Sequence, residues 1–174
     1  MNNLYNNIDE NKKIDSNEIT PINCIDKEKI EKKEKEELID IGLEIIKGNQ
    51  YAVVTMAGGQ GTRLGFDGPK GTFKLDVGKN GKYIFQILAE TLRLSKQLYN
   101  VLPYWYIMTS EQNNSQTISF FEEHNFFGYE KDKIKFFKQG ELPLLTPEGK
   151  MVIDYEKKII KTGADGNCGV YSSL

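Results

Sequence analysis

The segment Tyr51-Ala-Val-Val-Thr-Met-Ala-Gly-Gly-Gln-Gly-Thr-Arg-Leu-Gly65 joins an apolar run to a glycine-rich loop, and Pro69-Lys-Gly71 follows a few residues later. The apolar, β-branched part predicts a strand over 51–56. Glycines directly after a strand let backbone N–H groups converge on an anion, because no Cβ stands in the way. Arg63 and Lys70 add two positive charges to the same loop. This combination suits the triphosphate of a nucleotide.

Two widespread phosphate-binding motifs do not fit this loop. The Rossmann fingerprint requires Gly-x-Gly-x-x-Gly, but Leu64 occupies the position of the third glycine after Gly59 and Gly61. The P-loop requires Gly-Lys-Ser/Thr, whereas Lys70 is preceded by a proline and followed by a glycine. The remaining pattern is Gly-Gly-x-Gly-Thr-Arg-Leu-Gly with a later Pro-Lys-Gly.

Four further blocks follow the loop in order: Trp105-Tyr-Ile-Met-Thr-Ser110, Phe120-Phe-Glu-Glu-His-Asn-Phe-Phe-Gly128, Phe136-Phe-Lys-Gln-Gly140 and Ala164-Asp-Gly-Asn-Cys-Gly-Val-Tyr171. With them, the chain from Tyr51 onward resembles the eukaryote-type UDP-N-acetylglucosamine pyrophosphorylases. Plain UDP-glucose pyrophosphorylases resemble it less, since they typically have Met-Gly and Pro-Lys-Ser where this chain has Arg-Leu-Gly and Pro-Lys-Gly. Met56 replaces the leucine usual in the family. Cys168 replaces a glycine, so its Cβ is expected to crowd the sugar or to change the backbone angle.

The resemblance implies that UTP and N-acetylglucosamine 1-phosphate react to give UDP-N-acetylglucosamine and pyrophosphate, usually with Mg²⁺. The sugar phosphate oxygen would attack the α-phosphorus in line, and Arg63 and Lys70 would be the catalytic cations. Asn167 would bind the sugar moiety. The expected UTP-binding residues are Met56, Ala57, Gly58, Gly59, Gly61, Lys70, Gln139 and Gly166. The metal-binding aspartate of the family would lie beyond Leu174, so no metal ligand is expected in this chain.

The composition of the 174 residues is that of an ordinary globular protein, with 39% hydrophobic and 28% charged residues. A net charge of −2 gives no reason to expect nucleic acid or an anionic membrane as a partner. We expect UTP and a sugar 1-phosphate as partners, and the oligomeric state stays open. Cys24 and Cys168 occur in unrelated contexts, which favours free thiols and a cytoplasmic location. The N-terminus also lacks the features of a signal peptide.

Strands and helices alternate along the chain, which predicts the α/β class. We expect a Rossmann-like nucleotidyltransferase domain with a mostly parallel mixed sheet, helices on both faces and an N-terminal helical extension. The expected strands after the first are 104–109, 134–138 and short pieces within 72–77 and 150–153. The expected helices are 27–47 with Asp26 as N-cap, 83–98 and 114–125. The expected domains are a mobile polar tail over 1–25, a helical extension over 26–50 and the N-terminal half of the catalytic domain over 51–174.

Family members run to several hundred residues, so we expect the chain to be an N-terminal fragment that is truncated at its C-terminus and inactive alone. Two other functions stay open. One is a UTP-dependent pyrophosphorylase for another sugar 1-phosphate, such as glucose, galactose or N-acetylgalactosamine. The other is a non-catalytic nucleotide-binding half-domain.

Overall fold

The structure, a computed structural model, describes residues 17 and 19–174. Most of the expected polar tail over 1–25 therefore lies outside the described residues. The described chain separates into two compact units. Ile41–Leu142 and Thr162–Leu174 form the larger unit, and Pro143–Lys161 belongs with the residues up to Asp40. The three expected domains stay a prediction.

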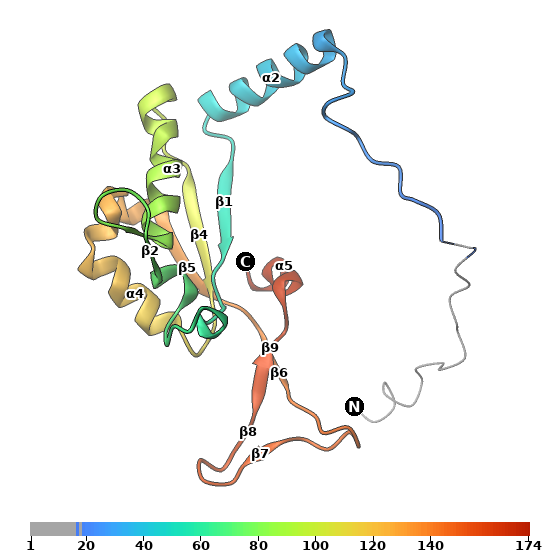
Figure 1. Cartoon of the computed structure of the whole chain (residues 1–174), viewed down its shortest axis with the longest axis vertical. Coiled ribbons are helices and arrows are strands. Elements are labelled where there is room, and N and C mark those ends of the chain that lie inside the picture. The colour runs from blue at the N-terminus through green and yellow to red at the C-terminus, as the bar shows by residue number, and fades with distance from the viewer. Residues whose placement is uncertain (1–16, 18) are drawn as a thin grey trace. The chain divides into compact units, whose positions relative to one another are not determined.

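Three parallel strands form the main sheet of the larger unit, in the order β1-β4-β5 (Figure 1). Helix α3 comes between β1 and β4 in the chain, and helix α4 comes between β4 and β5. The bounds are β1 (Ala52–Met56), α3 (Ile84–Tyr99), β4 (Tyr104–Thr109), α4 (Asn114–Glu123) and β5 (Ile134–Lys138). The α/β class and the parallel sheet are confirmed.

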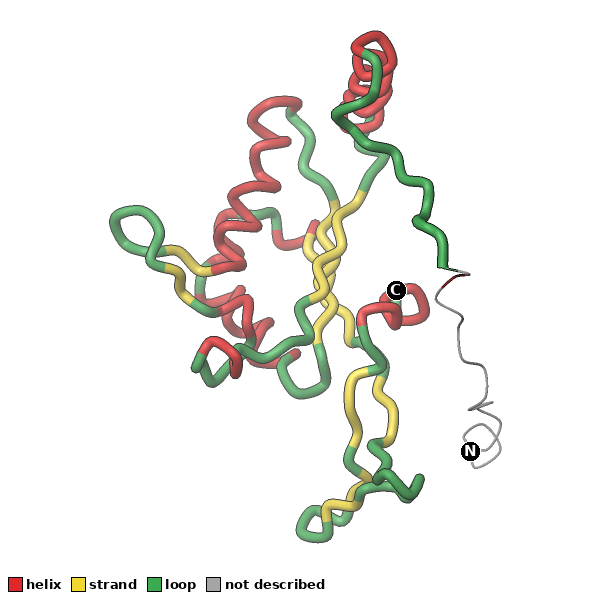
Figure 2. Tube along the Cα trace, turned by 45° about the vertical axis from the view of Figure 1, so that its right-hand side comes forward, coloured by secondary structure: helices red, strands yellow, loops and turns green. Residues whose placement is uncertain are grey.

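The core lies between this sheet and helices α3 and α4, which occupy one side of the strands in Figure 2. Alternate residues of a strand point to opposite faces, so Trp105 and Ile107 of β4 share this face and are both 0% exposed. The Trp105 Nε1–H donates to Thr55 Oγ1 over 2.8 Å, which satisfies the one polar group of the buried indole. The core cluster also contains Phe85, Ala89, Leu102, Phe121, Phe126, Tyr129 and Ile134.

The opposite face of β1 is more open to solvent. Val54 and Met56 point to that side and are 39% and 53% exposed. The short helix α5 (Val170–Ser173) lies beside them, and together they border a hollow of about 390 Å³. Apolar side chains therefore stay accessible on this face within the described chain.

Short paired strands complete the larger unit, and the sequence pattern indicates only one of them. β2 (Lys74–Leu75) falls within the expected extended piece and pairs antiparallel with β3 (Lys82–Tyr83). β6 (Glu141–Pro143) pairs with β9 (Thr162–Ala164). The β6–β9 pair matters for the site, because it brings the end of β5 close to the segment that follows β9.

Helix α2 (Lys32–Lys47) begins later than residue 27, so its expected start is wrong. Asp26 accepts a hydrogen bond from the Glu28 N–H at 3.1 Å and closes a local turn instead of capping the helix. Asp residues compete with helix formation in this way. Residues 143–161 contain an antiparallel hairpin of β7 (Ile153–Asp154) and β8 (Ile159–Ile160). None of the helices in the described part of the chain combines the length and apolarity needed to cross a bilayer.

Candidate functional site

A pocket of about 380 Å³ opens beyond the carboxyl ends of β1 and β5. Parallel α/β sheets generally bind their ligands at this edge. The pocket brings together most of the predicted site residues: Met56, Ala57, Gly58, Gly59, Lys70, Gln139, Gly166 and Asn167. Its lining also includes residues that the sequence did not single out: Thr55, Gly71, Ile84, Phe85, Leu88 and Ala164.

Backbone hydrogen bonds shape the glycine loop. The Ala57 N–H donates to Met108 O at 2.7 Å and extends the β1–β4 pairing by one residue. The loop then folds back on itself, since the Gly61 N–H donates to Gly68 O at 2.8 Å and the Lys70 N–H donates to Gly59 O at 3.0 Å. These two hydrogen bonds bring Lys70 back beside Gly58 and Gly59. Residues that are eleven or more positions apart in the sequence therefore line the same pocket.

The first glycine of the loop lies against the side chain of Gln139. A Cβ on Gly58 would stand 2.7 Å from Gln139 Oε1, so any side chain there would displace the Gln139 amide. The Gln139 backbone N–H donates to Thr109 O at 2.8 Å, so the end of β5 is held to the end of β4. In the described chain, the N–H groups of Gly58 and Gly59 donate to no backbone carbonyl. These two donors, together with the Gln139 amide, can therefore bind a ligand in the pocket.

Two predicted residues lie outside the pocket lining. Arg63 is exposed in a 3-10 helix, Thr62–Leu64, whose C-cap is Gly65 with φ 67°. Gly61 is buried, and a Cβ there would stand 2.7 Å from Phe66 Cδ1. Gly61 thus shapes the loop, while Lys70 is the predicted catalytic cation that lines the pocket.

The segment after β9 closes another side of the pocket. Gly166 has φ 87°, a backbone angle that favours glycine, and Asn167 begins a 3-10 helix directly after it. The Asp165 N–H donates to Gly140 O at 3.1 Å and ties this segment to the residue after Gln139. Cys168 has no positive φ, so its Cβ imposes no left-handed strain. Its side chain borders the hollow beside α5 instead of the pocket.

The described residues offer no cluster of three or more His, Cys, Asp or Glu side chains that could hold a metal ion. The polar groups that the pocket lining offers are backbone N–H donors, the Gln139 and Asn167 amides, the Thr55 hydroxyl and Lys70. Such groups bind anions and a flat polar ring.

A family profile described as UTP–glucose-1-phosphate uridylyltransferase matches residues 1–174. The chain is 38% identical over 169 residues to UDP-N-acetylglucosamine diphosphorylase 2 of Arabidopsis thaliana, covering 90% of this chain and 33% of that protein. It is 40% identical over 146 residues to UDP-N-acetylglucosamine pyrophosphorylase of Saccharomyces cerevisiae, covering 82% of this chain and 30% of that protein. The crystal structure of the Trypanosoma brucei uridine diphosphate N-acetylglucosamine pyrophosphorylase with an inhibitor superposes with a TM-score of 0.72 at 32% identity, over 82% of this chain and 29% of that one. The chain thus spans about a third of the length of these relatives.

Proposed function

Because the chain belongs to the UTP–glucose-1-phosphate uridylyltransferase family, we propose that it supplies the UTP-binding part of a uridylyltransferase. The proposed reaction joins UTP and N-acetylglucosamine 1-phosphate to give UDP-N-acetylglucosamine and pyrophosphate. The observation that carries the proposal is the convergence of Gly58, Gly59, Lys70 and Gln139 on one pocket. The preference for N-acetylglucosamine rests on the names of the relatives described above.

Each residue has a role that follows from its chemistry. The Gln139 side chain has an amide donor and an acceptor, which match the donor and acceptor edge of uracil. The backbone N–H groups of Gly58 and Gly59 bind the uracil or its ribose, and Lys70 neutralises the charge of phosphate oxygens. Gly166 permits close approach to the nucleotide, and Asn167 contacts the sugar phosphate. Met56 and Ala57 support the nucleoside with apolar contact.

Arg63 is exposed and lies outside the pocket lining. We assign it to the part of the triphosphate that extends out of the pocket, where it favours departure of pyrophosphate. Attack by the sugar phosphate oxygen on the α-phosphorus requires positioning and charge neutralisation more than proton transfer. These residues therefore act by binding and orienting two polyanions.

Mg²⁺ remains part of the proposal for the complete enzyme. Since the described residues form no metal cluster, they do not fit such a site, and no step above depends on the ion. Cys24 and Cys168 are both free and exposed, which supports a reducing compartment such as the cytoplasm.

The test separates binding from turnover. UTP binding to the 174-residue chain is measured by calorimetry, and pyrophosphate release is measured with UTP, Mg²⁺ and N-acetylglucosamine 1-phosphate. Binding should be at least about tenfold weaker in Lys70→Ala, since a charge-assisted bond is lost. It should be unchanged in Lys79→Ala, a lysine outside the pocket lining. Absence of UTP binding in the parent chain would contradict the proposal.

Turnover distinguishes the remaining functions. Release of pyrophosphate with glucose or galactose 1-phosphate in place of the N-acetylated sugar would favour another sugar specificity. UTP binding without turnover in a chain extended to the length of its relatives would favour the non-catalytic half-domain.

A further inference from the structure

A layer of buried polar side chains lies beneath the glycine loop, at the junction of β4 and α4. Thr109, Asn113 and Thr117 are 0% exposed and Ser110 is 7% exposed. Buried polar groups are costly unless hydrogen bonds compensate them. Such a layer at the carboxyl edge of the sheet therefore requires an explanation beyond packing.

Asn113 connects this layer to the glycine loop. Its Nδ2–H donates to Ala57 O at 3.1 Å, and its Oδ1 accepts from the Ser110 N–H at 2.9 Å. One side chain thus ties the first residue after β1 to the first residue after β4. Ala57 directly precedes Gly58, the glycine that contacts Gln139.

Thr109 connects the same layer to Gln139. Its carbonyl accepts from the Gln139 N–H at 2.8 Å, while its hydroxyl donates to Asn114 Oδ1 at 2.7 Å and lies 3.1 Å from Phe137 O. Ala57 is therefore held by Asn113 and Gln139 is held by Thr109, two residues of one buried polar layer. Both connections are made by residues of the chain itself, so they do not depend on a bound ligand.

These two connections, together with the Ala57 N–H bond to Met108 O, hold Gly58 in contact with the Gln139 amide. We propose that Asn113 is a positioning residue that holds Gly58 against the Gln139 amide and thereby makes the pocket select a pyrimidine nucleotide over a purine nucleotide. The inference rests on the proposed function, since it assumes that the base lies against Gly58 and Gln139. Loss of the bond to Ala57 O would let Gly58 shift from the Gln139 amide, and a base-binding edge that is held less firmly discriminates less between the two bases.

The experiment compares Asn113→Asp, Asn113→Ser and the exposed neighbour Gln112→Ala. Asn113→Asp keeps the acceptor for the Ser110 N–H and replaces the donor to Ala57 O with a buried carboxylate oxygen, whereas Asn113→Ser shortens the side chain without adding a charge. Affinities for UTP and ATP are measured by calorimetry, and amide shifts of Gly58 and of the Gln139 side chain are measured by NMR without nucleotide. Gln112→Ala should match the parent in every measurement.

We expect UTP binding to weaken about tenfold in Asn113→Asp, the effect of losing one buried hydrogen bond. ATP binding should weaken less, so that the UTP/ATP ratio falls. An equal loss for both nucleotides, or an unchanged ratio, would overturn the proposal. If Asn113→Asp does not fold, the ratio is judged on Asn113→Ser.

The NMR shifts separate this inference from the proposed function. If the parent chain binds no UTP, the proposed function fails and selectivity fails with it. Unchanged shifts of Gly58 and Gln139 in Asn113→Ser would by themselves overturn the positioning role. Shifts of Gly58 and of the Gln139 side chain, in addition to those of the direct partners Ala57 and Ser110, would support it.

Discussion

Single glycines in this chain are required for different physical reasons. Gly58 leaves space for the Gln139 amide, and Gly71 leaves space for the ring of Phe85. Gly166 is needed for its backbone angle, because nothing lies within 4 Å of a Cβ built on it. A glycine-rich motif therefore combines positions for close approach with positions for conformation.

Gly71→Ala should destabilise the protein by about 1–3 kcal/mol, the usual effect of overpacking a core. A Cβ there would stand 2.1 Å from Phe85 Cε2, and Phe85 is 1% exposed and cannot move freely. Gly42→Ala is the matched control, since nothing lies within 4 Å of its Cβ in helix α2. The control should be neutral or stabilising by up to about 1 kcal/mol. The free energies of unfolding of both variants are measured by urea denaturation. Equal urea midpoints for Gly71→Ala and Gly42→Ala would contradict the expectation.

Tyr129 should make stability depend on alkaline pH. Burial, with smaller contributions from Tyr51 and Glu130, raises the pKa of Tyr129 well above its usual value of 10.0. A raised pKa means that the folded state favours the protonated phenol, whose O–H donates to Pro103 O at 2.8 Å. The stability that the protonated phenol gives the folded state is fully present below about pH 10 and is lost as the pH rises further.

The measurement is the free energy of unfolding between pH 8 and 11.5 for the parent and for Tyr129→Phe. The phenylalanine variant should be less stable at pH 8, and the difference should shrink above pH 10. A difference that stays constant with pH would show that the phenol does not titrate in this way.

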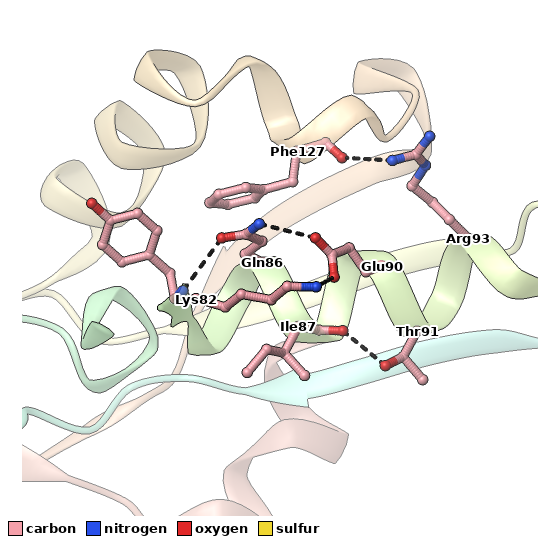
Figure 3. Close-up of polar contacts among 8 residues, drawn as sticks. Lys82, Gln86, Ile87, Glu90, Thr91, Arg93 and Phe127 are labelled. Carbon is pink, nitrogen blue, oxygen red and sulfur yellow. Dashed lines mark hydrogen bonds and ion pairs between the residues drawn. The ribbon is translucent and has the colours of Figure 1, made fainter. Parts of the chain in front are cut away.

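A row of polar contacts runs along helix α3, and two of them join it to Lys82 and Tyr83 of β3 (Figure 3). Lys82 pairs with Glu90, and Gln86 Nε2–H donates to Glu90 Oε1 at 2.9 Å. Further along the helix, Arg93 donates to Phe127 O at 3.2 Å. Another face of α3 contributes Ile84, Phe85 and Leu88 to the pocket lining. The polar contacts therefore stabilise the position of a helix that helps to form the pocket.

Glu90→Gln should lower stability by less than about 1 kcal/mol, because both charged side chains are partly exposed and solvent screens them. The hydrogen bonds from Lys82 and then Gln86 lower the pKa of Glu90 below 4.5. A lowered pKa gives stability that is present above about pH 4.5 and is lost as pH falls through the folded-state value. Urea midpoints from pH 3 to 7 should therefore converge for parent and variant at the acidic end. A difference that persists at pH 3 would assign the effect to packing instead of charge.

The pocket is built entirely by the larger unit. Its lining comes from Ile41–Leu142 and Thr162–Leu174, and residues 143–161 contribute nothing to it among the described residues. The strands β6 and β9, which flank the 143–161 segment in the sequence, pair with each other. Ligand binding should therefore tolerate changes within this segment.

Cleavage by trypsin after Lys157 or Lys158, which are exposed between β7 and β8, should leave UTP affinity within about twofold of the intact chain. The physical reason is that the cut strands remain held by pairing on both sides of the break. Affinity is measured by calorimetry on the purified nicked protein. Replacement of Thr162–Ala164 is the contrasting variant and should abolish binding, because Ala164 lines the pocket. A nicked chain that loses UTP would place part of the function in the 143–161 segment.

The sequence alone determined the local features of this protein. The apolar periodicity and the breaking residues predicted the strands 104–109 and 134–138 and a helix over 83–98, which the structure has as Ile84–Tyr99. Linear motifs predicted most of the pocket residues. Short-range patterns suffice where one element carries enough residues to show its period. The start of α2 was wrong, because a local Asx turn at Asp26 competes with the helix.

Tertiary structure decided what depends on distant residues meeting. The strands β3, β6 and β9 are too short to show a period, so pairing alone reveals them, whereas β2 falls within the extended piece expected over 72–77. Arg63 belongs to the same motif as Lys70, yet the fold-back at Gly61 leaves it outside the pocket lining. Asn113 had no signal in the sequence, because its importance arises only when Ala57, 56 residues away, accepts its hydrogen bond. Local periodicity specifies elements, whereas a binding site depends on which backbone groups the completed sheet brings within hydrogen-bonding distance.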